Sequence, residues 1–210
     1  GGHAKVAIEA IRADGRFDIV GVVDPKAPDG RTVLGVPWLG SDQVLKSLRE
    51  QGLAHGHVAI GDNRLREKLG LELLSMAFIL PVVVHPTAQV SPSAAVGQGS
   101  IVMARASVGP ATHIGQFCII NTGAIVEHDS VVEDSSHVAP GATMGGSVHV
   151  GAPALVGIGS VVRPGISIGD DAVIGAGSCV VRNVDPRITV VGVPARALPL
   201  RENHEIEQKT

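Results

Sequence analysis

The chain has 210 residues, a formal net charge of −3, 27 glycines and 13 prolines, but only 3 Phe, 1 Trp and no Tyr. A charged fraction of 18% and a hydrophobic fraction of 44% exclude a disordered chain. The absence of basic runs and of aromatic stacking platforms argues against nucleic-acid binding, and the apolar runs are too short to span a bilayer. With so few rings, the core must be filled by aliphatic and small residues at regular spacing.

Residues 1–80 show alternating helix and strand patterns. Apolar residues at helical spacing predict helices over 3–12, 43–51 and 64–74, and short apolar runs predict buried strands over 18–24 and 57–60. Alternation of this kind indicates a small parallel sheet of Rossmann type. In such a sheet a strand precedes the first glycine-rich turn, so we expect that strand to lie outside the numbering.

From residue 84 to residue 180 the sequence has a strict period of six. Every sixth residue is aliphatic, with Met144 once, and four residues later there is nearly always a small residue. Eight of the aliphatic residues are followed directly by glycine. We attribute these glycines to corners that require a positive φ angle.

This hexad resembles the hexapeptide-repeat family, whose fold is a left-handed parallel β-helix. The resemblance implies triangular coils of three hexads over residues 81–182, and a C-terminal tail over 183–210 in which we expect 201–210 to fray. The handedness rests on the resemblance alone. The expected fold is therefore an α/β Rossmann-like domain over 1–80 followed by an all-β left-handed parallel β-helix.

Residues eighteen apart stack on one face of such a helix, and one outward column is almost entirely apolar. It consists of Val83, Ile101, Ile119, His137, Leu155 and Val173. Because a monomer rarely exposes an apolar stripe of this length, we expect a neighbouring subunit to cover the column. The family implies a homotrimer.

Two N-terminal segments resemble parts of the sugar acetyltransferases. They are the glycine-rich start at residues 1–6 and the segment 58–64, and together they look like the nucleotide-sugar pocket of the 4-amino-sugar N-acetyltransferases. A glycine-rich turn at a helix N-terminus can hold phosphate, and an acid that ends a strand can bind a ribose. The implied nucleotide-sugar-binding residues are Gly1, Gly2, His3, Lys5, Asp24, Asp62, Asn63 and Asn121. Each has a structural alternative, as a turn former or a helix cap.

The segment 125–129 provides the candidate catalytic base. Acyl transfer to an amine needs a group that removes a proton at neutral pH, and histidine is the usual choice. His128 lies at a predicted corner, where its side chain must project outward, and Asp129 or Glu127 could orient its imidazole. The segment resembles the catalytic His-acid pair of the bacillosamine and perosamine N-acetyltransferases. That resemblance assigns His128 as base and Asp129 as its partner.

The resemblance also implies residues that bind acetyl-CoA. They are His137, Gly146, Ile158 and Arg196, the last within the segment 191–196, which resembles the tail near the nucleotide end of the coenzyme. His128 and His137 are nine residues apart, half a coil, and must face different sides of the prism. If both line one site, that site lies between subunits. A packed histidine at a subunit contact is the alternative for His137.

We therefore expect acetyl-CoA-dependent N-acetylation of a nucleotide-linked 4-amino-6-deoxy sugar, of the GDP-perosamine or UDP-bacillosamine type. We expect direct attack, no metal and no permanently bound cofactor. Alternatives are O-acetylation of sialic acid or a related sugar, a zinc-dependent β-helical carbonic anhydrase, and a non-catalytic module. Cys118 and Cys179 have neither metal-ligand nor redox spacing, which favours reduced thiols in the cytoplasm.

Overall fold

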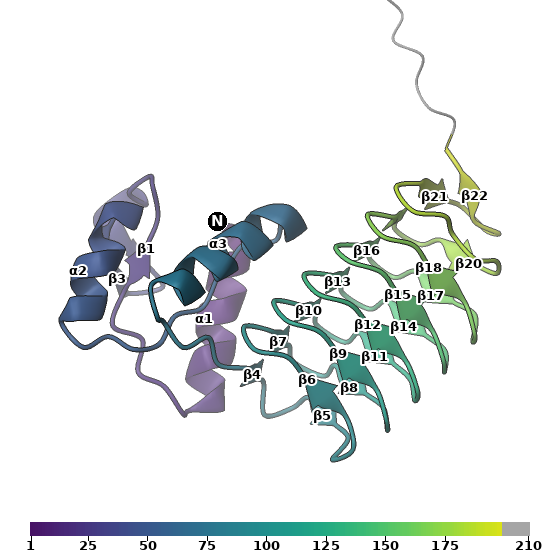
Figure 1. Ribbon diagram of the computed structural model, residues 1–210, viewed down its shortest axis with the longest axis horizontal. Helices are drawn as coiled ribbons and strands as arrows, with labels where there is room; N and C mark the ends of the chain where they lie inside the picture. Colours follow the sequence, from purple (N-terminus) through teal and green to yellow (C-terminus); the bar gives the residue numbers. More distant parts are fainter. Residues whose placement is uncertain (199–210) are drawn as a thin grey trace, which may run out of the picture.

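The computed structural model describes residues 1–198, which form a small α/β unit joined to a long triangular coil (Figure 1). The predicted fraying of residues 201–210 falls outside the described residues, as does the end of the predicted tail.

The N-terminal unit contains three helices and a mixed three-stranded sheet. The helices are α1 (Gly2–Asp14), α2 (Leu45–Glu50) and α3 (Asn63–Ser75), with the short 3-10 helices η1 (Asp29–Arg31) and η2 (Asp42–Val44). The sheet has the order β1-β3-β2, with β1 (Val22–Val23) parallel and β2 (Thr32–Val33) antiparallel to β3 (Val36–Gly40). All three predicted helices are present.

The strand predictions in this unit were wrong in extent. The strand predicted over 18–24 shortens to β1, and residues 57–60 form no strand. A strand needs a hydrogen-bonding neighbour, and within residues 1–198 this region makes only an isolated bridge between His55 and Ile79. The apolar residues that suggested a strand pack against neighbouring structure instead, with Val58 in the cluster that contains Leu73 and Leu80.

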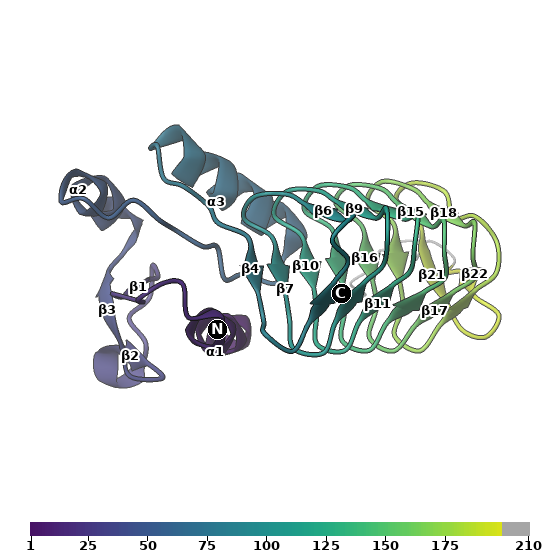
Figure 2. The ribbon, with the colours of Figure 1, turned by 90° about the horizontal axis from the view of Figure 1, so that it is seen from below.

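The coil has three flat faces whose strands are parallel, apart from the last strand of the first face (Figures 1 and 2). The first face contains β4 (Val83–Val84), β7 (Ile101–Val102), β10 (Ile119–Ile120), β13 (His137–Val138), β16 (Leu155–Val156), β19 (Val173–Ile174), β21 (Thr189–Val191) and β22 (Arg196–Ala197). The second contains β5 (Gln89–Val90), β8 (Ser107–Val108), β11 (Ile125–Val126), β14 (Thr143–Met144), β17 (Val161–Val162) and β20 (Cys179–Val180). The third contains β6 (Ala95–Val96), β9 (His113–Ile114), β12 (Val131–Val132), β15 (His149–Val150) and β18 (Ser167–Ile168).

Three edges join these faces. We call the turns between the first and second faces the first edge, those between the second and third faces the second edge, and those between the third and first faces the third edge. The second edge comprises residues 91–94, 109–112, 127–130, 145–148, 163–166 and 181–184. Strands pair with those eighteen residues away, as Ile119 pairs with Ile101 and with His137, so the predicted coil length is correct.

The interior follows the hexad. The aliphatic positions fill the prism, and from Val102 to Ile174 almost all are fully buried. Hydroxyls at the small positions bond to the backbone of neighbouring coils. For example, Ser100 Oγ donates to Gly115 O and accepts from the amide of Cys118, each at 2.8 Å. Hydroxyls such as that of Ser100 are therefore satisfied by the backbone of the coil itself.

The explanation of the eight glycines after the aliphatic positions was wrong. None of them has a positive φ; the left-handed residues lie two positions further on, and include Gly99, Phe117 and Asp129. A Cβ atom on Gly97 would lie 2.6 Å from the carbonyl carbon of Gly115, and one on Gly109 would lie 2.7 Å from the amide nitrogen of His128. Glycine is required there because the next coil approaches too closely for any side chain.

Helix α1 covers the lower part of the apolar column on the first face. Ala7 and Ala10 pack with Val83, Ile101 and Ile119, which are at most 1% exposed. The expectation that a neighbouring subunit covers the whole column was therefore wrong for this half, because the apolar side of α1 already buries it. Leu155 and Val173, further up the column, are only partly buried.

Helix α3 lies along the third edge and joins the two parts of the chain. Phe117, the only Phe, Trp or Tyr residue within the repeat, points out of the prism and packs against Gly70 of α3 together with Leu73 and Leu80. Near the start of α3, Arg64 forms an ion pair with Asp171 at 2.6 Å.

The first face continues beyond residue 182, where the hexad ends. β21 pairs parallel to β19, with Val173 opposite Thr189, and β22 then turns back antiparallel to β21. The last coil is shorter than eighteen residues, which explains why the sequence period does not reveal it. No helix within residues 1–198 has the length and apolar content that crossing a membrane requires.

Candidate active site

His128 and Asp129 form an exposed pair on the second edge. His128 Nδ1 lies 2.7 Å from Asp129 Oδ2, and Asp129 has a φ angle of 56° at the corner. An ionised carboxylate only accepts hydrogen bonds, so Nδ1 carries a proton in this pair, and in the neutral imidazole Nε2 then keeps a free lone pair. The geometry is that of a base oriented by an acid.

Gly146 lies one coil above His128 on the same edge and supports its ring. A Cβ atom on Gly146 would lie 2.5 Å from both Cε1 and Nε2 of His128, and the glycine is buried. The imidazole therefore rests directly on the backbone of the next coil. Gly146 therefore helps to position the catalytic base. This role is separate from the contact with acetyl-CoA that the sequence predicts.

His137 and Asn121 form a second pair, at the border of the first face and the first edge. Asn121 Oδ1 accepts a hydrogen bond from the amide of Thr122 at 2.8 Å, which leaves its Nδ2 to donate to His137 Nε2 at 3.0 Å. In the neutral ring, His137 must then carry its proton on Nδ1. Asn121 thus fixes the tautomer of His137, a role that sequence reasoning missed.

His137 is held in the neutral form. Its pKa is lowered to about 4, chiefly by burial and to a smaller extent by the positive charge of Arg66 and by His3. A neutral Nδ1–H group can donate a hydrogen bond to an uncharged carbonyl oxygen. His137 is therefore suited to bind and polarise a thioester carbonyl, as its predicted contact with acetyl-CoA requires.

Arg66 is a buried side chain that the sequence patterns did not reveal. It is 1% exposed, and its guanidinium donates to Phe117 O at 2.6 Å, to Ser135 O at 2.8 Å and to Asn63 Oδ1 at 2.8 Å. It also reaches the carbonyls of residues 60 and 61 at 3.1 Å. Although burial lowers the pKa of Arg66 to about 10, the group stays cationic at neutral pH. Its helical position gave no signal, because an arginine on a helix is usually solvated.

The glycine-rich start is exposed and leaves backbone donors free. Gly1 is the N-cap of α1 and has no side chain that could cap the helix. The space beside Gly1 and Gly2 is open, because no other atom lies within 4 Å of the position that a Cβ atom would take on either glycine. Lys5 is exposed on the first turn. His3 is partly buried, its Nε2 has no partner within residues 1–198, and burial and Arg66 lower its pKa. This arrangement is compatible with an anion at the helix N-terminus.

Two other predicted sugar-binding residues, Asp24 and Asp62, have structural partners. Asp24 follows β1, and its Oδ1 accepts from the amide of Lys26 at 2.9 Å. Asp62 caps α3, where its carboxylate accepts from the amide of Leu65 at 2.8 Å. These bonds match the turn and cap alternatives, although each carboxylate keeps a further oxygen.

The predicted role of Asn63 in sugar binding must be corrected. Its Nδ2 donates to Pro153 O at 3.1 Å and to Ala154 O at 2.9 Å, while its Oδ1 accepts from Arg66. Because these bonds occupy both ends of the amide and attach α3 to the third edge, we no longer assign Asn63 to sugar binding.

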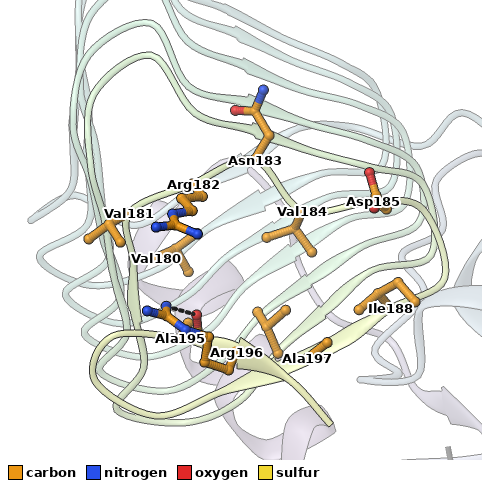
Figure 3. A pocket seen from close by; sticks show the side chains of 11 residues that line it. Val180, Val181, Arg182, Asn183, Val184, Asp185, Ile188, Ala195, Arg196 and Ala197 are labelled. Atoms are coloured by element: carbon orange, nitrogen blue, oxygen red, sulfur yellow. Dashed lines mark hydrogen bonds between the residues drawn. The ribbon is translucent and has the colours of Figure 1, made fainter. Parts of the chain in front are cut away.

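The open end of the coil contains a cavity of about 160 Å³. Its walls include the predicted coenzyme residue Arg196, together with Arg182, Asn183 and Asp185, over an apolar floor that includes Val184 (Figure 3). Arg196 is exposed, and its Nη1 donates to the carbonyl of Ala195 at 2.8 Å.

Within one chain the predicted coenzyme residues do not meet. His128 and Gly146 lie on the second edge, whereas His137 lies on the first face and Ile158, 60% exposed, lies on the first edge. The second edge is the corner of the triangle opposite the first face, so His128 and His137 are on opposite sides of the prism.

Cys118 does not have the environment of a nucleophile. Both thiols are free, Cys118 is fully buried, and burial raises its pKa to about 12. Within residues 1–198 no three His, Cys, Asp or Glu side chains are grouped closely enough to hold a metal ion.

The chain is similar to several proteins of known structure. The family model of the PglD N-terminal domain matches residues 1–73. A variant of GDP-perosamine N-acetyltransferase from Caulobacter crescentus, solved with CoA and GDP-perosamine, is 45% identical with a TM-score of 0.92, covering 95% of this chain and 93% of that one. The acetyltransferase domain of PglB from Neisseria gonorrhoeae, solved with acetyl coenzyme A, is 35% identical with a TM-score of 0.90, covering 94% and 95%. WeeI from Acinetobacter baumannii is 26% identical with a TM-score of 0.75 over the same shares.

Fold and site together define an acyltransferase built on a left-handed parallel β-helix behind a small α/β unit, which confirms the predicted fold class and enzyme class. The chain belongs to the sugar acetyltransferase family that includes the perosamine N-acetyltransferase of C. crescentus and the acetyltransferase domain of PglB.

Proposed function

We propose that this protein transfers the acetyl group of acetyl-CoA to the 4-amino group of a nucleotide-linked 4-amino-6-deoxy sugar. The observation that carries the proposal is the His128–Asp129 pair, exposed on the second edge with the imidazole seated on Gly146. The higher identity to the enzyme solved with GDP-perosamine, 45% against 35% for the PglB domain, favours a GDP-linked acceptor.

The reaction follows from the state of His128. Its free Nε2 removes a proton from the acceptor nitrogen as that nitrogen bonds to the thioester carbonyl carbon. Asp129 stabilises the imidazolium that forms. The C–S bond of the tetrahedral intermediate then breaks, and the proton on His128 passes to the departing sulfur. No acyl-enzyme intermediate is required.

His137 supports the developing oxyanion in this scheme. Its Nδ1–H is directed by the bond from Asn121 to Nε2 and would donate to the thioester oxygen, where negative charge accumulates. Asn121 then acts through His137, in place of the direct sugar contact expected from the sequence.

We place the site between subunits of a homotrimer. His128 and His137 lie on opposite sides of one prism, so a single coenzyme can meet both only if neighbouring chains contribute one each. Residues 1–80 serve as the nucleotide-sugar unit in this proposal, with Gly1, Gly2, His3, Lys5, Asp24 and Asp62 as its contacts. Residues 81–182 carry out acyl transfer, and 183–210 form the tail. The two free thiols fit a cytoplasmic location.

A complementation experiment tests the shared site. His128→Ala and His137→Ala are purified singly and also co-expressed. Each single variant is expected to be nearly inactive, whereas random mixed trimers regain about a quarter of wild-type activity, because that share of interfaces combines two intact histidines. Mixed assemblies no more active than the single variants would contradict a site between subunits, and sedimentation as a monomer would contradict the trimer.

Acceptor competition tests the reaction itself. GDP-perosamine, UDP-linked 4-amino sugars and a hydroxyl acceptor such as sialic acid are offered together with limiting acetyl-CoA. The amine of the GDP-linked sugar is expected to take the acetyl group. Preferential acetylation of the hydroxyl would establish the O-acetyltransferase alternative.

A further inference from the structure

Strand β3 holds the backbone of Asp24 at two points. Asp24 follows β1 directly, and its amide donates to Gly40 O at 3.1 Å. Its carbonyl oxygen accepts a hydrogen bond from Trp38 Nε1 at 3.0 Å. Trp38 and Gly40 both belong to β3. Within residues 1–198 no backbone amide donates to the Asp24 carbonyl, so the indole is the group that satisfies it.

The indole bond lies next to an irregularity in the ladder between β1 and β3. Val22 lies opposite Trp38, whereas Val23 lies opposite Gly40, so the register shifts between these two pairs. A shift of this kind interrupts the regular series of ladder hydrogen bonds. An aliphatic side chain at position 38 could fill the same space but has no donor. Trp38 therefore supplies with its side chain a bond that the irregular ladder does not supply to Asp24.

Arg31 restrains the indole ring from a second direction. Its guanidinium carbon lies 4.9 Å from the centroid of the Trp38 ring, which is a cation–π distance. Arg31 ends η1 and has a φ angle of 53°, in the left-handed region. A residue with a Cβ atom occupies that region at a cost in energy, and it stays there where the surrounding structure holds it. The hydrogen bond to Asp24 and the guanidinium together fix the orientation of the indole.

These contacts determine where the Asp24 carboxylate lies. Its Oδ1 accepts from the amide of Lys26 at 2.9 Å, and in the part of the chain that the structure describes its Oδ2 has no partner. An acid at the end of a strand in a nucleotide-binding sheet accepts hydrogen bonds from ribose hydroxyls. Such bonds form only over a narrow range of distances and angles. A displacement of the Asp24 peptide therefore weakens them, although the carboxylate itself is unchanged.

We propose that Trp38 is a positioning residue for nucleotide recognition: its indole N–H fixes the peptide group of Asp24 and so places the carboxylate that a ribose contacts. Arg31 acts one step further away, by holding the indole. The inference rests on the proposed function for the role of Asp24 as a nucleotide contact. It gives β3 a part in binding the acceptor, through a side chain that is not itself a ligand of the nucleotide.

A double-mutant cycle tests whether Trp38 acts through Asp24. GDP and UDP are titrated calorimetrically into the full chain and into Trp38→Phe, Asp24→Ala and the double variant. Trp38→Phe keeps a ring beside Arg31 but removes the N–H, and it is expected to weaken nucleotide binding about fivefold. Asp24→Ala is expected to weaken binding about tenfold. The double variant should lose about the same tenfold, because the contribution of Trp38 requires the carboxylate.

Steady-state kinetics separate positioning from general damage to the fold. In Trp38→Phe the KM for the nucleotide-linked acceptor is expected to rise about fivefold, while kcat and the KM for acetyl-CoA change by less than about twofold. Arg49→Met is the matched control, because Arg49 Nε donates to Ala77 O at 3.0 Å, a bond of the same kind and length in the same unit. It should change neither KM. Equal increases of both KM values in Trp38→Phe would contradict a positioning role.

Tryptophan fluorescence gives a second readout in the unmodified protein. Trp38 is the only tryptophan in the chain, so the emission comes from this one side chain. Its emission is expected to change on addition of nucleotide, with the same Kd as calorimetry. Nucleotide binding that leaves the emission unchanged would place the ligand away from Trp38 and overturn the inference.

The outcomes distinguish this inference from the proposed function. A double variant about 50-fold weaker than wild type, the product of the two single effects, would overturn the action of Trp38 through Asp24, as would normal binding by Asp24→Ala. Titration needs no acetyl donor, so the expected cycle supports the positioning role even if no amino sugar is acetylated. Acetyl transfer with nucleotide affinity unchanged in Trp38→Phe refutes the inference while the proposed function stands. Failure of the wild type to bind either nucleotide would overturn both.

Discussion

The His128 imidazole packs directly against the backbone of Gly146, which lies one coil above His128. A Cβ atom at Gly146 would lie 2.5 Å from His128 Nε2, far inside van der Waals contact. Since the φ angle of Gly146 is not positive, alanine is allowed by its backbone. The glycine is therefore required by the position of the imidazole.

Gly146→Ala is expected to lower kcat by one to two orders of magnitude, about 10- to 100-fold, because the methyl group displaces the base by an ångström or more. The melting temperature should change by only a few degrees. Steady-state kinetics and thermal melting provide the measurements. Ser147→Ala, at the exposed neighbouring position, is the control and should retain activity; equal losses in both variants would show that the corner, and not the ring contact, matters.

His128→Ala is expected to lower kcat/KM by about 100-fold or more, the usual contribution of a general base. Asp129→Asn should cause a smaller loss, because the imidazole remains but loses its orienting acceptor. His149→Ala is a closely matched control, since His149 Nε2 lies 3.1 Å from Glu133 Oε1 in another exposed His-acid pair. Activity of His128→Ala within a few fold of wild type would refute its assignment as base.

Arg66→Met is expected to reduce the free energy of unfolding by about 3–5 kcal/mol, because it leaves several buried carbonyls without a donor and separates α3 from the third edge. Urea unfolding measures the change. Arg64→Ala removes an exposed ion pair two residues away on the same helix and should cost at most about 1 kcal/mol. Similar losses in the two variants would mean that the buried guanidinium contributes no more than a surface charge.

The free energy of unfolding is expected to fall in mild acid. Burial lowers the pKa values of His57 and His137 from 6.5 to about 4, and both ring nitrogens of His57 are buried without partners within residues 1–198. Below pH 6.5 the unfolded chain binds protons that the folded chain does not, so stability is complete above that pH and declines towards pH 4. Each histidine contributes at most about 3 kcal/mol to the decline.

Urea unfolding from about pH 7 to about pH 5 tests this dependence. His57→Gln should flatten the slope, whereas His113→Gln, at an exposed position on the third face, should not. A slope unchanged by His57→Gln would contradict the protonation account, whatever the effect of the substitution on stability at neutral pH.

Local repetition made the coil predictable from sequence. Each hexad specifies its own strand and corner, and the register of eighteen follows by counting, so the positions of His128 and His137 on different sides were predictable. The N-terminal unit was harder to predict from the sequence, because a strand over 57–60 needs a neighbouring strand, and no local pattern shows whether one is present. The glycines showed a similar limit: their spacing was evident, but the close approach of the next coil is a property of stacking.

The sequence by itself determined the family, the triangular coil, the shortage of aromatic residues and the catalytic candidate His128. Those features depend on residue type and spacing within a few positions along the chain. Only the tertiary structure decided which polar groups serve the site and which serve the fold: it joined Asn121 to His137, assigned Asn63 to the attachment of α3, covered half of the apolar column with α1 and buried Arg66 between the two parts. Such pairings join residues many positions apart, and hydrogen-bond geometry and burial are set by the packing of whole elements.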